Sequence, residues 1–352
     1  MNKVSFFGKI GITVLIIIFV INIAACGNRK LTRYEAEFLL FFDTLTKIVA
    51  YTDSKEEFTK YSQQIYDYLK ECHELYDIYN NYNEINNIKT INDNAGIAPV
   101  KVDKKIIDLL RFAKEWYYKT GGKMNVAYGA VLKIWHDYRT AGINDPENAE
   151  LPPMEQLEAA AKHTDINKII IDEEASTVFL DDPDMSLDVG AIGKGYAAEQ
   201  VSQMAIGNGF TSGLISIGGN VRTIGNRGES KGPWNVGIQN PDTGIGQSDI
   251  QIVNLTDMSL VTSGNYVRFY TVNGRNYHHI IDPDTLFPSE YLTAVTIICQ
   301  DSGMADALST AVYNMPFEQG LEFIENFPGT EALWVLKNGE IKYSANFVDF
   351  IK

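Results

Sequence analysis

The chain has 352 residues, of which 45% are hydrophobic and 21% are charged. This composition is typical of a globular protein and excludes a disordered, a collagenous or a polytopic membrane protein. Acidic residues outnumber basic ones and give a net charge of −15 at pH 7, so the chain lacks the excess of basic residues that is typical of nucleic-acid-binding proteins. With 3 cysteines, 5 histidines and no CxxC motif, we expect neither a disulfide framework nor a zinc cluster.

The N-terminus carries a targeting signal. Lysines precede an apolar run over residues 10–25, which ends in Ile23-Ala24-Ala25-Cys26. This pattern is typical of a bacterial lipoprotein signal peptide. We therefore predict a signal peptide over 1–25 and a lipidated N-terminus with a tether over 26–36, which hold the protein on the extracytoplasmic face of the cell membrane. An uncleaved membrane-spanning helix is the alternative.

Helical and strand patterns alternate after the tether without repeats or a long linker, so we treat 37–352 as a single unit. Helices are predicted where apolar residues recur at steps of three and four. They cover residues 58–79, 103–120, 154–163, 304–314 and 317–326. Strand-like runs cover 168–172, 177–180, 213–217, 234–239, 266–272, 277–281 and 294–299. Hairpin signals at Asn273-Gly274 and Asn338-Gly339 indicate an α+β fold with a mostly antiparallel sheet and packed helices.

A glycine-rich segment over 187–196 contains an acid, Asp188, and a lysine, Lys194, at which we expect a helix to begin. Glycines allow the backbone to approach a ligand closely, and a helix N-terminus offers free N–H groups. The segment is therefore a candidate phosphate cradle. It contains neither a GxxxxGK[ST] nor a GxGxxG fingerprint, and a tight turn with a surface lysine is the alternative.

A predicted helix near the C-terminus carries Ala305-Asp306-Ala307-Leu308-Ser309-Thr310. Spacings of three and four residues put the oxygens of Asp306, Ser309 and Thr310 on one face. One carboxylate and two hydroxyls are hard ligands that suit Mg²⁺. The alternative is structural, with both hydroxyls bonded to the backbone.

The strand-like run Tyr277-His278-His279-Ile280-Ile281 puts its two histidines on opposite faces, so one of them can face a site. The pKa of histidine suits proton abstraction near neutral pH, although a lone histidine in a strand is often structural. Glycine-rich turns at Gly218-Gly219-Asn220 and Thr262-Ser263-Gly264 follow β-rich runs. Glycine there permits ligand approach, but ordinary turns explain these motifs equally well.

Together and in this order, these motifs resemble those of the ApbE family of FAD:protein FMN transferases. The resemblance spans about residues 38–341, nearly all of the expected mature chain, and family members are commonly lipoproteins. It implies an α+β fold similar to the tunnelling fold. It also implies an enzyme that cleaves the pyrophosphate of FAD with Mg²⁺, attaches FMN by a phosphoester to a Thr or Ser of a target protein, and releases AMP.

The resemblance also implies roles for single residues. Asp188 and Lys194 would contact FAD, and His279 would be the catalytic base. The backbone carbonyl of Ala191 would bind Mg²⁺ beside Asp306, Ser309 or Thr310.

Further positions match the flavin-binding segments of the family. Tyr79 would contact the flavin, and Ile280 would lend a backbone contact to FAD. Two matches depart from the common family pattern: Phe42-Asp43-Thr44 replaces Met-Gly-Thr, and Lys123-Met124-Asn125 replaces Ala-Phe-Asp. We expect Phe42, Lys123, Met124 and Asn125 at the FAD site, with contacts to adenine and ribose that differ from the common pattern.

The expected partners are FAD, Mg²⁺, the membrane through a lipid anchor, and a target protein with an acceptor Thr or Ser, such as an extracytoplasmic electron-transfer flavoprotein. Two other hypotheses use the same residues. An FAD pyrophosphatase would admit water in place of the hydroxyl and yield FMN and AMP. A non-catalytic flavin-binding or solute-binding lipoprotein would leave FAD unchanged.

We predict that Cys26→Ser leaves the protein unprocessed or releases it from the membrane, because the acyl chains are attached at this thiol. Cell fractionation and the mass of the N-terminal peptide check this. A chain that starts near Arg29 is the control, and it should fold and remain active. Processed, membrane-bound Cys26→Ser protein would contradict the assignment.

Overall fold

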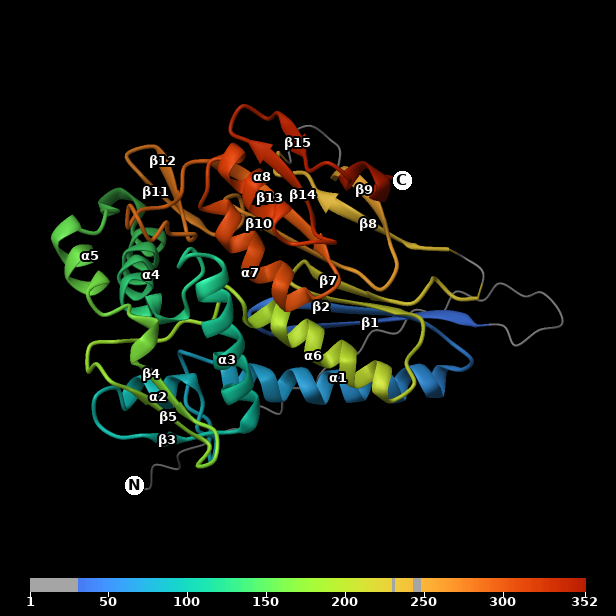
Figure 1. Ribbon diagram of the computed structural model, residues 1–352, viewed down its shortest axis with the longest axis horizontal. Coiled ribbons are helices and arrows are strands. Elements are labelled where there is room, and N and C mark those ends of the chain that lie inside the picture. The colour runs from blue at the N-terminus through green and yellow to red at the C-terminus, as the bar shows by residue number, and fades with distance from the viewer. Residues whose placement is uncertain (1–30, 230–231, 243–247) are drawn as a thin grey trace, which may run out of the picture.

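A computed structural model describes residues 31–229, 232–242 and 248–352 of the chain (Figure 1). The predicted signal peptide and the lipidated Cys26 lie outside these residues. Strand β1 (Thr32–Phe41) pairs antiparallel with β2 (Thr44–Thr52), so the tether that we predicted up to residue 36 ends earlier. In the described part of the chain, no helix has both the length and the apolar character needed to cross a membrane.

The main sheet has 8 strands in the order β1-β2-β6-β7-β10-β13-β14-β15. Each neighbouring pair is antiparallel, which confirms the predicted sheet type. The remaining strands are β6 (Gly213–Ile217), β7 (Asn220–Ile224), β10 (Ser259–Gly264), β13 (Leu292–Cys299), β14 (Glu331–Leu336) and β15 (Ile341–Tyr343).

Helices cover one face of this sheet, and Figure 1 shows α6 and α7 crossing it side by side. The helices that contribute to this hydrophobic core are α1 (Lys55–Tyr76), α2 (Ile88–Asp93), α3 (Lys104–Lys119), α6 (Gly193–Gly207), α7 (Ser302–Tyr313) and α8 (Phe317–Glu325). Helix α1 begins at Ser54, whose side chain accepts a hydrogen bond from the Glu57 N–H. Its apolar stripe is buried, as the periodicity predicts.

A hairpin of β8 (Trp234–Gln239) and β9 (Asp249–Leu255) packs with the opposite face of the sheet. Strand β13 shows why both faces are apolar. Val295 and Ile297 belong to the core under the helices, whereas Ala294 and Ile298 belong to the core under this hairpin. A strand covered on both faces is apolar throughout, and alternation is lost.

A third group of elements lies beside the sheet, at the left of Figure 1. It contains α4 (Gly129–Asn144), α5 (Met154–Ala161), the hairpin β11 (Phe269–Val272) and β12 (Arg275–His278), and a small sheet of β3 (Val100–Lys101), β4 (Ile169–Asp172) and β5 (Thr177–Leu180). Trp135 of α4 packs into a hydrophobic cluster with β11 and β12, and its Nε1 donates to the Leu286 carbonyl at 2.9 Å.

Both hairpin signals are confirmed, because Asn273-Gly274 joins β11 to β12 and Asn338-Gly339 lies between β14 and β15. Asn273 and Gly274 have φ of 49° and 78°, the left-handed conformation that such turns require. The strand predicted over 277–281 is too long, because β12 ends at His278. Helices α2 and α4 and strands β1, β2, β3, β7, β9, β10, β14 and β15 lie outside the predicted elements.

Helices α6 and α7 lie in close contact at Gly195. A Cβ atom at this position would overlap the Ser302 carbonyl oxygen and Cβ of Asp306. Because residue 195 has no Cβ atom, its N–H can donate to Oδ2 of Asp306 at 2.8 Å. One turn later, Oε2 of Glu199 accepts bonds from the Ser302 N–H and from Nε of Arg222, each at 3.0 Å. The buried ends of both helices are therefore joined by hydrogen bonds.

We predict that Gly195→Ala lowers the free energy of unfolding by about 1–3 kcal/mol, because the added methyl group meets backbone that cannot move aside. Gly207→Ala, at the far end of the same helix where nothing lies within 4 Å of the new methyl group, is the matched control. It should leave stability unchanged or raise it by about 0.5–1 kcal/mol. Denaturant unfolding compares the two, and equal stability would contradict the close approach.

Candidate active site

A cavity of about 760 Å³ opens beside the main sheet, within the range of small-molecule and cofactor sites. All five motifs from the sequence meet there, together with one face of α4. Lining residues come from segments 42–44, 76–80, 122–128, 188–194, 216–221, 262–268 and 279–283, and from one face each of α4 and α7. Residues far apart in the chain therefore share one site, as the resemblance predicts.

One corner of the cavity gathers oxygen atoms from the start of α6 and from α7. Asp306 is 4% exposed and lines the cavity. The Thr310 hydroxyl donates to the Ala191 carbonyl oxygen at 3.3 Å, so these two predicted ligands are neighbours. Burial raises the pKa of the Asp306 carboxyl group, whereas the charge of Lys194 and the hydrogen bond from Gly195 act to lower it. A carboxylate, a carbonyl and a hydroxyl form a donor set that fits a hard cation.

Ser309 is not part of this corner, and its prediction as a metal ligand is wrong. Its side chain is fully buried, and its Oγ donates to the Asp306 carbonyl oxygen at 2.9 Å and pairs with Oγ of Ser263 at 2.9 Å. Three residues along a helix turn a side chain by about 300°, whereas four turn it by about 400°. Thr310 therefore shares the cavity face with Asp306, and Ser309 faces β10.

Asp188 and Lys194 both line the cavity at the start of α6. Oδ1 of Asp188 accepts the Gly190 N–H at 2.8 Å, and Nζ of Lys194 donates to the Gly190 carbonyl at 3.4 Å. Burial raises the pKa of Asp188, while His136, Lys194 and Arg139 act in the opposite direction. Both residues therefore lie on the cavity wall where α6 begins at Gly193, and phosphate binding by this segment stays a prediction.

His279 lines the cavity, whereas His278 is buried behind it. His278 uses both ring nitrogens, because Nε2 lies 2.8 Å from the Ser289 carbonyl and Nδ1 accepts the Ile280 N–H at 3.2 Å. Nδ1 of His279 lies 3.3 Å from the Arg268 carbonyl. Burial lowers the pKa of His279 to about 3, assisted by the charges of Arg268, His278, Arg139 and Lys194. The imidazole is therefore neutral near pH 7 and able to accept a proton.

Two arginines that the sequence analysis missed also line the cavity, Arg139 on α4 and Arg268 before β11. Arg139 donates to Nδ1 of His136 at 2.9 Å, and burial lowers its pKa. With Lys194 they place three cationic side chains on the cavity wall in a protein of net charge −15. A signal for helix α4 does exist in the sequence, because the run Ile134-Trp135-His136-Asp137-Tyr138-Arg139 begins with apolar residues and ends with charged ones. No capping residue, however, marks the start of a helix.

Phe42 and Tyr79 line the cavity, and their contact with FAD stays a prediction. Phe42 lies in the turn between β1 and β2 with φ of 53°, and its N–H donates to Nδ1 of His73 at 3.4 Å. Tyr79 is 55% exposed, and its ring centroid lies 5.2 Å from that of His136. Oδ1 of Asp77 accepts the Tyr79 N–H at 2.6 Å and holds the backbone of this segment in place.

The segment 123–125 contributes two of its three predicted residues to the cavity. Lys123 lines it and forms ion pairs with Asp282 at 2.9 Å and Asp284 at 2.8 Å. Asn125 also lines it, but its amide bonds to the Thr164 carbonyl and the Ala127 N–H. Met124 is fully buried in the main hydrophobic core. Its side chain is therefore no FAD contact, and that prediction is wrong.

Ile280 lines the cavity, but its backbone groups already have partners. Its N–H donates to Nδ1 of His278, and its carbonyl oxygen accepts the Ser289 N–H at 3.0 Å. A carbonyl oxygen has a second lone pair, so the carbonyl remains the group of Ile280 that can contact a ligand.

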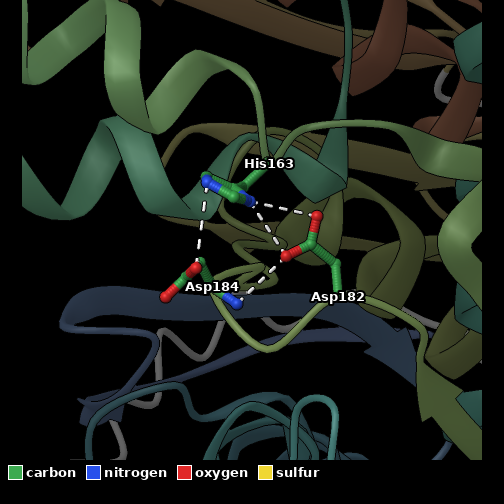
Figure 2. A group of neighbouring side chains, drawn as sticks. All are labelled: His163, Asp182 and Asp184. Atoms are coloured by element: carbon green, nitrogen blue, oxygen red, sulfur yellow. Dashed lines mark hydrogen bonds and ion pairs between the residues drawn. The ribbon is translucent and has the colours of Figure 1, made fainter.

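Figure 2 shows a separate cluster of His163, Asp182 and Asp184, whose potential ligand atoms lie within 4.8 Å of one another. Nδ1 of His163 lies 2.9 Å from Oδ1 of Asp182. The buried Asp182 carboxylate also accepts a bond from Nζ of Lys168 at 2.8 Å. Because Lys168 already supplies a positive charge, we interpret the cluster as an ion pair that joins the end of α5 to the segments flanking β4 and β5.

The family model described as "ApbE family" matches residues 42–334. Over its full length, the chain is 30% identical to a Treponema pallidum protein named FAD:protein FMN transferase and covers 97% of it. A Klebsiella pneumoniae protein of the same name is 31% identical over 73% of this chain and 77% of its own length. The ApbE protein of Thermotoga maritima superposes with a TM-score of 0.79 at 29% identity, over 91% of this chain and all of that one.

We predict that His279 stays neutral as the pH falls through 6.5, with a midpoint near 3, because burial and nearby cations disfavour the imidazolium. NMR titration of the histidine ring measures this. Arg268→Gln should raise the midpoint toward 6.5 by removing one cation. Arg275→Gln, on the same hairpin and ion-paired with Glu290, is the control. If Arg275→Gln raised the midpoint as much as Arg268→Gln, the rise could not be assigned to the loss of a cation beside His279.

Proposed function

Because the chain belongs to the ApbE family, we propose that it is an FAD:protein FMN transferase. The reaction breaks the bond between the FMN-side phosphorus of FAD and the bridging oxygen. It joins that phosphorus to the hydroxyl oxygen of a Thr or Ser in a target protein, and AMP leaves. The supporting observation is a single cavity that holds a candidate cation site, three cationic side chains and a neutral imidazole.

The cations of the cavity wall bind and orient the diphosphate of FAD. Lys194, Arg139 and Arg268 line the same cavity and provide the positive charge that this acidic protein otherwise lacks. Phosphoryl transfer depends mainly on positioning and charge neutralisation. Fixed cations in a partly buried cavity supply both.

His279 accepts the proton of the acceptor hydroxyl as its oxygen attacks the FMN-side phosphorus. When Nδ1–H donates to the Arg268 carbonyl, Nε2 is left as the proton acceptor. The negative charge of a bound diphosphate favours the imidazolium and raises the pKa of His279 from its low value in the free protein. Substrate binding thus makes His279 a stronger base.

Asp306, the Ala191 carbonyl and Thr310 are the residues that would hold Mg²⁺. A bound Mg²⁺ would neutralise charge on the phosphate oxygens and orient them. The Gly195 N–H keeps the Asp306 carboxylate in place before any cation binds.

The protein would act on the outer face of the cell membrane, with acylated Cys26 as its anchor. The apolar leader that ends in Ala24-Ala25-Cys26 supports this proposal. Its target would be an extracytoplasmic electron-transfer flavoprotein, close enough to the membrane to reach the cavity mouth.

Incubation with FAD, Mg²⁺ and a candidate acceptor should add the mass of FMN to one Thr or Ser, as measured by mass spectrometry of the acceptor. We predict that His279→Ala lowers the transfer rate by about 10²–10⁴-fold, the usual contribution of a positioned base. His278→Ala is the control, and its effect should be mild. Release of free FMN and AMP without a modified acceptor would instead identify an FAD pyrophosphatase, and unchanged FAD a binding protein.

We predict that Asp306→Asn lowers transfer by about 10²-fold or more and shifts the Mg²⁺ dependence to higher concentration. The amide oxygen can still accept the Gly195 N–H, but the negative charge is lost. Thr310→Ala should have a smaller effect, because water can replace a neutral hydroxyl. Asp257→Asn is the matched control, because Oδ1 of Asp257 accepts the Gly225 N–H at 2.7 Å outside the cavity. Full activity of Asp306→Asn at low Mg²⁺ would contradict the assignment.

A further inference from the structure

Three buried side chains on the cavity wall have polar atoms for which the described part of the chain provides no hydrogen-bond partner. These atoms are Nδ2 of Asn220, the hydroxyl of Tyr128 and Oδ1 of Asn314. Asn220 favours the Asp306 carboxylate and so belongs to the candidate cation site. Tyr128 and Asn314 are 6% and 2% exposed. A buried polar atom without a partner costs about 1–3 kcal/mol. Such atoms on a cavity wall therefore indicate a ligand that satisfies them.

The two side chains flank the same segment of the cavity wall. Tyr128 packs in one hydrophobic cluster with Ile281. On the other side, Ser289 joins this segment to the end of α7, because its N–H donates to the Ile280 carbonyl and its hydroxyl donates to the Tyr313 carbonyl. Asn314 follows directly as the C-cap of α7. Tyr128 and Asn314 therefore belong to one end of the cavity.

The amide of Asn314 has a defined orientation. Its Nδ2 donates to the Thr310 carbonyl oxygen at 3.2 Å, which leaves Oδ1 as a hydrogen-bond acceptor for a ligand. Asp306, Thr310 and Asn314 follow one another at intervals of four along one face of α7. Eight residues of helix separate the candidate cation site from Asn314 by about 12 Å.

The Tyr128 hydroxyl is a donor under all ordinary conditions. Burial raises its pKa, as do the negative charges of Asp282 and Asp284. The same end of the cavity therefore offers a ligand one acceptor, Oδ1 of Asn314, and one donor, the Tyr128 hydroxyl.

We propose that Tyr128 and Asn314 recognise the edge of the adenine base of FAD, an inference that rests on the proposed transferase function. Oδ1 of Asn314 accepts a bond from the 6-amino group, and the Tyr128 hydroxyl donates to a ring nitrogen. A 6-oxo purine presents an acceptor and an N–H donor in place of these groups. Oδ1 of Asn314 therefore selects the amino base, whereas the Tyr128 hydroxyl can also accept the N–H of a 6-oxo purine and binds either base.

The uracil-like edge of the flavin also combines a donor with acceptors, but its place in the reaction disfavours it. FMN must become attached to a second protein, so the FMN half of FAD has to lie toward the open side of the cavity. Tyr79, 55% exposed, provides an aromatic surface there. Tyr128 and Asn314 are buried and suit the half that leaves as AMP.

The test measures equilibrium binding of FAD, of its 6-oxo analogue and of FMN to the full chain and its variants. The wild type should prefer FAD to the 6-oxo analogue by about tenfold, since the analogue loses the hydrogen bond to Oδ1 of Asn314. Asn314→Leu and Tyr128→Phe should each weaken FAD binding about tenfold, and Asn314→Leu should also abolish this preference. Binding of FMN, which lacks the base, should be unchanged. Tyr128→Phe should not lower the thermal midpoint of the ligand-free protein, because the lost hydroxyl had no partner.

Matched controls remove similar groups elsewhere. Asn326 caps α8 as Asn314 caps α7, with Nδ2 donating to the carbonyl four residues earlier at 3.0 Å. Tyr61 is 7% exposed, and its hydroxyl donates to the Asn208 carbonyl at 3.3 Å. Asn326→Leu and Tyr61→Phe should leave FAD binding and the preference unchanged.

Three results overturn the proposal. Equal binding of FAD and its 6-oxo analogue by the wild type would show that the base edge is not read, while transfer to an acceptor would still support the transferase. Equal loss of FAD and FMN affinity in the two variants would assign these side chains to the flavin. Unchanged affinity in both variants would show that water alone satisfies them. If the wild type neither binds FAD nor transfers FMN, the proposed function itself fails.

Discussion

The close contact between α6 and α7 at Gly195 is the constraint on which the site depends. A buried carboxylate is unstable unless hydrogen bonds or cations compensate it. Asp306 obtains both, from the Gly195 N–H at 2.8 Å and from the charge of Lys194. Because residue 195 has no side chain, the start of α6 reaches α7, and the Ala191 carbonyl meets the Thr310 hydroxyl. The oxygen-lined corner is a consequence of this helix packing.

The second constraint is electrostatic. A protein with a net charge of −15 repels an anionic substrate over long distances, so binding depends on local cations. Lys194, Arg139 and Arg268 come from three separate elements and converge on one cavity. Burial, together with the charges of these cations, lowers the pKa of His279 to about 3. In the proposed mechanism, the charge of the bound substrate raises this pKa again.

Part of the fold and of the site could be predicted from local patterns. The periodicity of α1 and the two Asn-Gly turns are local signals, and the structure confirms them. Helix α4 was missed because its N-cap, Tyr128, makes no capping hydrogen bond, and Arg139 was missed with it. We predict Ser309 and Met124 at the site only because they belong to the same short motifs as residues that line the cavity. Their side chains instead face β10 and the main core.

The sequence by itself determined the family, the α+β class, the helix that carries Asp306 and Thr310, and that one of two adjacent histidines can face a site, with His279 implied by the family resemblance. These properties follow from motifs and periodicities within short segments, where neighbouring residues decide the outcome. Only the tertiary structure decided which side chains share the cavity with them. Arg139, Arg268, Tyr128 and Asn314 lie on different elements, and their proximity results from how α4, α7 and the β11–β12 hairpin pack beside the sheet. Such long-range packing leaves no signal in any single segment, because each residue's local pattern is satisfied by helix or turn formation alone.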